Sequence, residues 1–123
     1  MLRARVKKLC AALESELTAE FSLVLTNDKE IRELNKKFRS KDKPTDVLSF
    51  PSNSTSYLGD LVISVDTATL QAKTYGCSLL DELTRLTIHG LLHLLGYEHE
   101  RVGSSTARKM RKKEELLVEQ ISR

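Results

Sequence analysis

Apolar residues recur along this chain with two spacings, and each spacing predicts one kind of secondary structure. Apolar residues three or four positions apart predict amphipathic helices, whereas short β-prone runs between turn residues predict strands. Helices are expected at 2–17, from 28 or 29 to 38, at 66–75, at 79–95, and from 104 or 105 to 121. Strands are expected at 21–26, 47–50 and 57–64. Residues 97–103 are expected to form a loop between the last two helices.

Residues that can begin or end a helix lie at most of these boundaries. The predicted N-terminal caps are Asn27 or Asp28, then Asp66, then Ser78, which forms a capping box with Asp81. Gly76 and Gly96 are expected to end the preceding helices in the left-handed conformation. Pro44 cannot continue a helix, and Pro51 is expected to end the second strand.

The helix at 79–95 is expected to be the centre of the domain. It carries leucine at eight positions and has little polar face: 79, 80, 83, 86, 91, 92, 94 and 95. The order of elements predicts an α+β fold, in which a small mixed sheet of three or four strands packs with helices around this buried central helix. A chain of 123 residues fits one such domain, covering 1–123.

Composition is that of a globular protein, with 40% hydrophobic and 30% charged residues. The longest apolar stretch, 83–95, is interrupted by charged and histidine residues and is shorter than the roughly 20 residues that cross a bilayer. The basic N-terminus is not followed by the apolar region of a secretory signal. Cys10 and Cys77 stand far apart and are expected to be buried thiols without chemistry. These features predict a cytoplasmic protein.

The formal net charge of +3 is unevenly distributed. Residues 36–43 carry five bases and one acid, and a second cluster lies between 108 and 113. Basic clusters suit polyanions such as RNA, because each neutralised phosphate releases counterions. An ordinary solvated helix face also explains the second cluster.

All three histidines of the chain fall between positions 89 and 99. His89 and His93 are four residues apart, so a helix places both imidazoles on one face. Gly96 can then reverse the backbone and bring His99 to the same point. Three histidine nitrogens leave the fourth position of a tetrahedral zinc ion open to water or substrate, which is the pattern of a catalytic site. We therefore predict one catalytic zinc ion held by these three residues.

A single histidine on an apolar helix is more often a satisfied core residue, but the trio favours a metal. Two imidazoles one turn apart in a leucine-rich helix would cost desolvation unless an ion organised them. Glu98 is the nearest candidate for a fourth ligand, or for an acceptor that holds a histidine N–H. We favour the second role.

The spacing H-x-x-x-H-x-x-G-x-x-H is also that of the metzincin peptidases. Their general base is a glutamate directly after the first histidine, where this chain has Gly90. Loss of such a base costs roughly 10²–10⁴ in rate, which weakens a peptidase interpretation. Hydrolysis of a phosphodiester instead needs cations for the developing negative charge, and the basic segment 36–43 can supply them.

Three segments together resemble the YbeY family of bacterial metal-dependent endoribonucleases. The string from His89 to His99 resembles its zincin-like signature, His-Gly-Leu-Leu-His-Leu-Leu-Gly-Tyr-Glu-His. Residues 35–51, with Arg39 and the run Lys-Asp-Lys-Pro-Thr-Asp-Val-Leu-Ser-Phe-Pro, resemble a second signature, and 58–64 resemble a third. Two positions differ: the family usually has aspartate in place of Glu98, and the stretch before Met110 is often acidic where this chain is basic.

The resemblance implies a zincin-like fold, one zinc ion per chain on His89, His93 and His99, and Arg39 facing the metal. Arg39 and His89 would then be the catalytic residues. It further implies cleavage of single-stranded RNA, maturation of the 3′ end of 16S rRNA and quality control of ribosomes. The implied partners are the small ribosomal subunit, one of its proteins and an Era-type GTPase.

Two alternatives and one role remain open at this point. The alternatives are a zinc metallopeptidase-like hydrolase and a metal-stabilised ribosome-binding module without turnover. The general base is unassigned, because Asp46 and Asp60 are the carboxylates to consider and each fits a structural role in a turn or at a strand end.

Overall fold

The computed structural model describes residues 1–97 and 104–122, with side chains for 1–97 and 108–122, and its elements follow the predicted order. The five helices are α1 (Leu2–Ala12), α2 (Asp28–Arg39), α3 (Val65–Tyr75), α4 (Leu79–Leu94) and α5 (Ser104–Ser122), and the three strands are β1 (Glu20–Thr26), β2 (Val47–Pro51) and β3 (Tyr57–Ser64). The predicted α+β class is confirmed. None of the described helices is both long and apolar enough to cross a membrane.

The three strands form one mixed sheet in the order β1-β3-β2. β1 runs parallel to β3, with Leu23 opposite Leu61, and β2 runs antiparallel to β3, with Ser49 opposite Leu61. β2 therefore lies at one edge of the sheet. Because side chains alternate across a strand, Leu61 and Ile63 face one side of β3 and Val62 faces the other.

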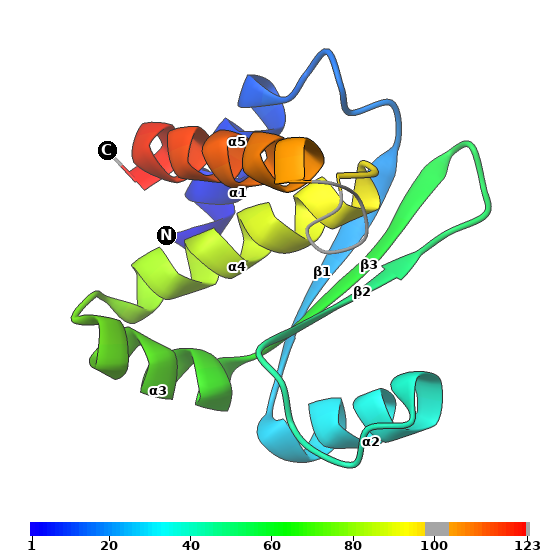
Figure 1. Ribbon diagram of the computed structural model, residues 1–123, viewed down its shortest axis with the longest axis vertical. Helices are drawn as coiled ribbons and strands as arrows, with labels where there is room; N and C mark the ends of the chain where they lie inside the picture. The colour runs from blue at the N-terminus through cyan, green and yellow to red at the C-terminus, as the bar shows by residue number, and fades with distance from the viewer. Residues whose placement is uncertain (98–103, 123) are drawn as a thin grey trace.

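The two faces of the sheet carry different helices (Figure 1). α4 packs on β2 and β3 and is covered on its other sides by α1, α3 and α5. Its core partners include Leu61 on the sheet and Leu9 and Met110 on the covering helices. α2 lies on the opposite face, where Ile31 packs against Leu48 and Val62. The prediction of a buried central helix is confirmed, since the sheet and three helices exclude solvent from most of α4.

Two local predictions were wrong. The first helix ends at Ala12 rather than at 17, since Leu13 already departs from helical geometry and residues 13–16 form turns. Asp66 does not cap α3: the helix begins at Val65, and Ser64 accepts the hydrogen bond from the backbone N–H of Thr67. Asp66 instead accepts a hydrogen bond from the backbone of Asp28 at the start of α2. Asp66 thus makes a contact between α2 and α3 in place of the predicted cap of its own helix.

The remaining predicted boundaries agree with the structure to within a residue or two. Asn27 caps α2, and Ser78 accepts from the Asp81 N–H at the start of α4. Gly76 and Gly96 both have positive φ, as predicted for the left-handed position. α2 already ends at Ser40, before Pro44 is reached.

α4 approaches the sheet most closely at Gly90. A Cβ atom there would lie 2.8 Å from Leu61 Cδ2 and 3.4 Å from both Ser49 Oγ and Val47 Cγ2. Leu61 is fully buried, so it has little room to move. A glutamate at this position would have to enter the sheet. The position that bears the general base in metzincins therefore has no room for a carboxylate in this fold.

The substitution Gly90→Ala is expected to lower the free energy of unfolding by about 1–3 kcal/mol, the usual cost of overpacking a core. Within a helix, glycine to alanine ordinarily stabilises by about 1 kcal/mol, so the expected sign is the reverse of the helix-propensity effect. Urea unfolding followed by circular dichroism measures it. A gain in stability would contradict the close contact with Leu61.

Candidate metal and phosphate site

One narrow stripe of the central helix is open to solvent. Between Glu82 and Leu94 every residue of α4 is buried except Arg85, His89 and His93. These three are spaced four residues apart, so they form a row along one face of the helix. A basic residue and two histidines thus occupy the accessible face of this part of α4.

The two imidazoles in this row converge on one point. His89 Nε2 and His93 Nε2 lie 3.1 Å apart, and the ring centroids are 4.7 Å apart with the planes at 73°. Two nitrogens bound to one tetrahedral zinc ion at about 2.0–2.1 Å would be separated by roughly 3.3 Å. The donor pair therefore fits a shared metal ion with little movement of either ring.

The third predicted ligand, His99, lies outside the described residues, as does Glu98. Within the part of the chain that the structure describes, no group of three histidine, cysteine or acidic side chains is arranged to hold a metal. His89 and His93 are therefore two candidate ligands of the predicted three, and the prediction for His99 remains untested. Tyr97, just before it, is tied down by a hydrogen bond from its hydroxyl to Glu16 Oε1, 2.7 Å away.

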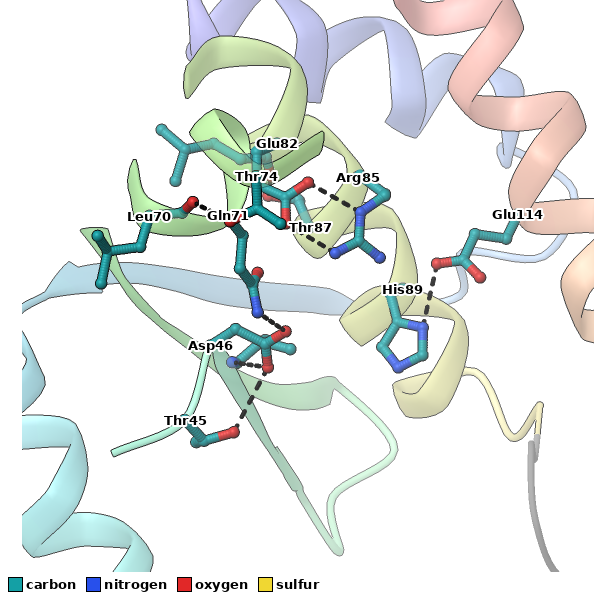
Figure 2. Close-up of polar contacts among 12 residues, drawn as sticks. Thr45, Asp46, Leu70, Gln71, Thr74, Glu82, Arg85, Thr87, His89 and Glu114 are labelled. Carbon is teal, nitrogen blue, oxygen red and sulfur yellow. Dashed lines mark hydrogen bonds and ion pairs between the residues drawn. The ribbon is translucent and has the colours of Figure 1, made fainter. Parts of the chain in front are cut away.

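A carboxylate that sequence reasoning missed contacts the first histidine. Glu114 Oε1, on α5, lies 3.1 Å from His89 Nδ1, the ring nitrogen on the far side from His93 (Figure 2). The two side chains are only 14% and 24% exposed. Glu114 can therefore accept a hydrogen bond from Nδ1–H of His89. In that tautomer the lone pair of Nε2 is available for a metal.

A signal for Glu114 was present in the spacing of α5. Met110, Leu117 and Ile121 form the buried stripe of this helix. Glu114 is four residues after Met110 and three before Leu117, so it falls on that apolar stripe, where a lone charged residue needs a partner. Glu115, its neighbour in sequence, is exposed.

Arg85, one turn before His89, is held in a fixed orientation by a buried acid. Its Nε and Nη2 donate to the two carboxylate oxygens of Glu82 at 2.9 and 2.7 Å, and Glu82 is only 1% exposed. This hydrogen-bonded pairing raises the pKa of Arg85 above its ordinary value, and the charges of Glu114 and Asp46 add to the effect. The guanidinium therefore keeps its charge beside the histidine pair.

Arg39 reaches the same part of the molecule from the other face of the sheet. Its Nη2 donates to the backbone carbonyl of Ser49, on the edge strand β2, at 3.3 Å. Ser49 Oγ in turn donates to the carbonyl of Gly90 at 3.5 Å. Two contacts thus connect Arg39, which is exposed, with the residue next to His89. This placement brings Arg39 toward the histidine pair, while its catalytic role remains a prediction.

The two carboxylates considered as general base have structural partners. Asp46 accepts hydrogen bonds from its neighbour Val47 N–H at 2.7 Å and from Gln71 Nε2 at 3.3 Å (Figure 2). Asp60 accepts from the hydroxyl of Tyr57, and it lies on the face of β3 away from α4. Asp60 is therefore on the wrong side of the sheet to act at the histidines.

The remaining sequence features take ordinary places. In the second basic cluster Arg108, Lys109, Arg111 and Lys112 are exposed, whereas Lys113 donates to Glu16 Oε2 at 2.6 Å. Its pairing with Glu16 raises the pKa of Lys113 and lowers that of Glu16. The two cysteines are not joined in a disulfide, but Cys77 is exposed and Cys10 only partly covered, so the expectation that both are buried was wrong.

Comparison with known proteins agrees with this architecture. The sequence model of the family described as Endoribonuclease YbeY matches residues 1–122. The chain is 50% identical over 108 residues to the Endoribonuclease YbeY of Aquifex aeolicus, covering 85% of this chain and 71% of that protein. It is 49% identical over 105 residues to that of Nautilia profundicola, covering 84% and 73%.

The fold is also shared with a solved structure. The solution structure of TM1509 from Thermotoga maritima superposes with a TM-score of 0.74 at 30% sequence identity, covering 98% of this chain and 80% of that one. This arrangement of helices and strands is thus known from a solved structure. The chain belongs to the YbeY endoribonuclease family.

Proposed function

We propose that this chain is a zinc-dependent endoribonuclease that cleaves single-stranded RNA. The observation that carries the proposal is the accessible row on α4, where His89 and His93 direct two Nε2 atoms to one point. Membership of the YbeY family supports RNA as the substrate. Zinc is the metal that three neutral histidine ligands favour, with His99 as the third.

Each group would have a distinct task. Zinc in a three-histidine site supplies a Lewis acid and lowers the pKa of bound water toward about 7. His89 and His93 hold the ion, and Glu114 keeps His89 in the tautomer that can bind it. Arg39 presents a planar pair of donors to the phosphate, which suits two of its oxygens at once.

The cellular role that we propose follows from the family resemblance. It is maturation of the 3′ end of 16S rRNA and quality control of ribosomes in the cytoplasm. The partners would be the small ribosomal subunit, one of its proteins and an Era-type GTPase. The exposed basic side chains of segment 36–43 support contact with a polyanion, because each can neutralise a phosphate.

The proposal is tested by metal content and by cleavage. Elemental analysis of purified protein is expected to give about one zinc per chain. The metal-loaded protein is then incubated with a single-stranded fragment of precursor 16S rRNA and with the same fragment annealed to its complement. We expect cleavage of the single strand only. Binding without cleavage would favour a ribosome-binding module, and absence of stoichiometric metal would overturn the zinc site.

Substitution of Glu114 tests how His89 is held. Glu114→Gln removes the charge that stabilises the Nδ1 proton, so we expect zinc affinity to fall about 10–100-fold, the usual effect of losing such a partner. Competition with a chromophoric chelator measures the affinity directly. The matched control is Glu115→Gln, which makes the same change at an exposed neighbour and should leave affinity unchanged. An equal loss of zinc affinity in both variants would show that Glu114 has no specific role in holding His89.

A further inference from the structure

An aromatic ring lies exposed beside Arg39. Phe38, near the end of α2, is 57% exposed, although its neighbours Ile31 and Leu34 pack into or against the apolar cluster beneath α2. The ring packs against Phe50 of β2, with centroids 5.3 Å apart and planes at 70°. This contact orients the Phe38 ring but leaves more than half of its surface open.

One lysine lies over this ring, and further basic residues are exposed in the same segment. Lys37 Nζ lies 5.3 Å from the ring centroid, and Lys36, Arg39, Lys41 and Lys43 are all exposed in the same segment. The single acid of the segment, Asp42, is paired with Arg32 at 2.8 Å. The surface around Phe38 therefore has positive charge and an open aromatic face, the combination that holds single-stranded nucleic acid.

The Phe38 ring also lies next to the part of β2 that contacts Arg39 and α4. Phe38 contacts Phe50 and Arg39 contacts Ser49, which are adjacent residues of the edge strand β2. Ser49 Oγ in turn donates to the carbonyl of Gly90, the residue after His89. An RNA strand whose phosphate contacts Arg39 would therefore pass Phe38, the residue next to Arg39 in the sequence.

We propose that Phe38 is a stacking platform for one base of single-stranded RNA bound across segment 36–43. This inference rests on the proposed function, because it adds a base-binding position to that RNA site. Stacking on a phenyl ring accepts any base, so Phe38 contributes affinity and register rather than sequence preference. It also favours single strands, since the bases of a duplex are stacked on each other and their faces are not accessible.

The chain contains no tryptophan, which gives a direct test. Phe38→Trp introduces a single indole at the proposed platform, and a base stacked on it should quench its fluorescence. The protein is titrated with a short oligoadenylate RNA, immediately after mixing and in the cold, and a gel checks that the RNA is intact. We expect saturable quenching by the RNA. Inorganic polyphosphate, which has the charge but no bases, should cause none.

Matched variants separate stacking from general effects. Leu70→Trp places an indole on α3 at a residue that is 63% exposed, and its fluorescence should not respond to the RNA. In a second measurement, anisotropy of a labelled oligoadenylate reports affinity for variants without tryptophan. Phe38→Ala is expected to bind about tenfold more weakly, and Phe38→Tyr within about twofold of the original chain.

The outcomes distinguish failure of the Phe38 stacking platform from failure of the proposed RNA-cleaving function. If the unmodified chain binds the oligonucleotide but Phe38→Ala binds equally well, the platform is disproved and the RNA site remains. Equal quenching by polyphosphate would also overturn it, because charge alone would then account for the signal. If the unmodified chain fails to bind any single-stranded RNA, the proposed function falls and the platform with it.

Discussion

Replacing His93 with alanine is expected to abolish stoichiometric zinc binding and to reduce cleavage of single-stranded RNA about a thousandfold. The substitution removes one of the two nitrogens that lie 3.1 Å apart on α4. A catalytic metal is worth several kcal/mol of transition-state stabilisation, and each 1.4 kcal/mol is about tenfold in rate. Elemental analysis and initial rates of cleavage measure the two effects on the same preparation.

The fold should survive this change, and thermal unfolding provides the control. A ligand that binds only the folded state raises the melting temperature. We therefore expect a chelator to lower the melting temperature of the unmodified chain and to leave that of His93→Ala unchanged. If the variant retains both its zinc and its activity, His93 is not a ligand. If the two proteins cleave equally slowly, a contaminating nuclease explains the activity.

Reversing the charge at Arg39 has the second largest expected effect. Arg39→Glu removes the donors that we propose for the phosphate and adds a repelling carboxylate. We therefore expect the cleavage rate to fall about 10²–10³-fold, as when an enzyme loses one donor to a developing negative charge. Zinc content should not change, because Arg39 donates to the Ser49 carbonyl and is not one of the proposed ligands. Arg39→Lys keeps the charge but loses the planar pair of donors, so its rate should be intermediate.

The matched control for Arg39 is Lys36→Glu, which makes the same change of charge on the same helix at another exposed residue. A general electrostatic role would weaken both variants alike, with the loss restored at low salt. We expect Lys36→Glu to reduce RNA binding modestly and to keep the rate at saturating RNA. An Arg39→Glu variant with the same behaviour as Lys36→Glu would show that Arg39 only attracts the substrate.

Most of the fold was predictable because its signals are local. The caps at Asn27 and Ser78 satisfy backbone N–H groups within their own first turn, so their geometry does not depend on the rest of the chain. Leucine spacing likewise identified the central helix. Prediction was wrong where a contact between elements replaced a local one: Asp66 accepts from Asp28 on another helix, and Ser64 takes the cap.

The candidate site was predictable in part. His89 and His93 share one face of a single helix, so their spacing alone predicted that both would bind the same metal ion. Glu114 was missed because it is 25 residues away and meets His89 only when α5 packs on α4. Sequence reasoning had assigned the acceptor role to Glu98, which lies outside the described residues. The apolar stripe of α5 contained the missing clue, since Glu114 interrupts it.

The sequence by itself determined the order of helices and strands, the buried leucine helix and the paired histidines on it. These features arise from interactions within one or two turns, which act wherever the segment lies. Only the tertiary structure decided that Gly90 must be small, that Glu114 faces His89 and that Phe38 lies exposed beside Arg39 at the sheet edge. Those relations depend on how close two elements approach each other, and that distance is set by the packing of the whole core.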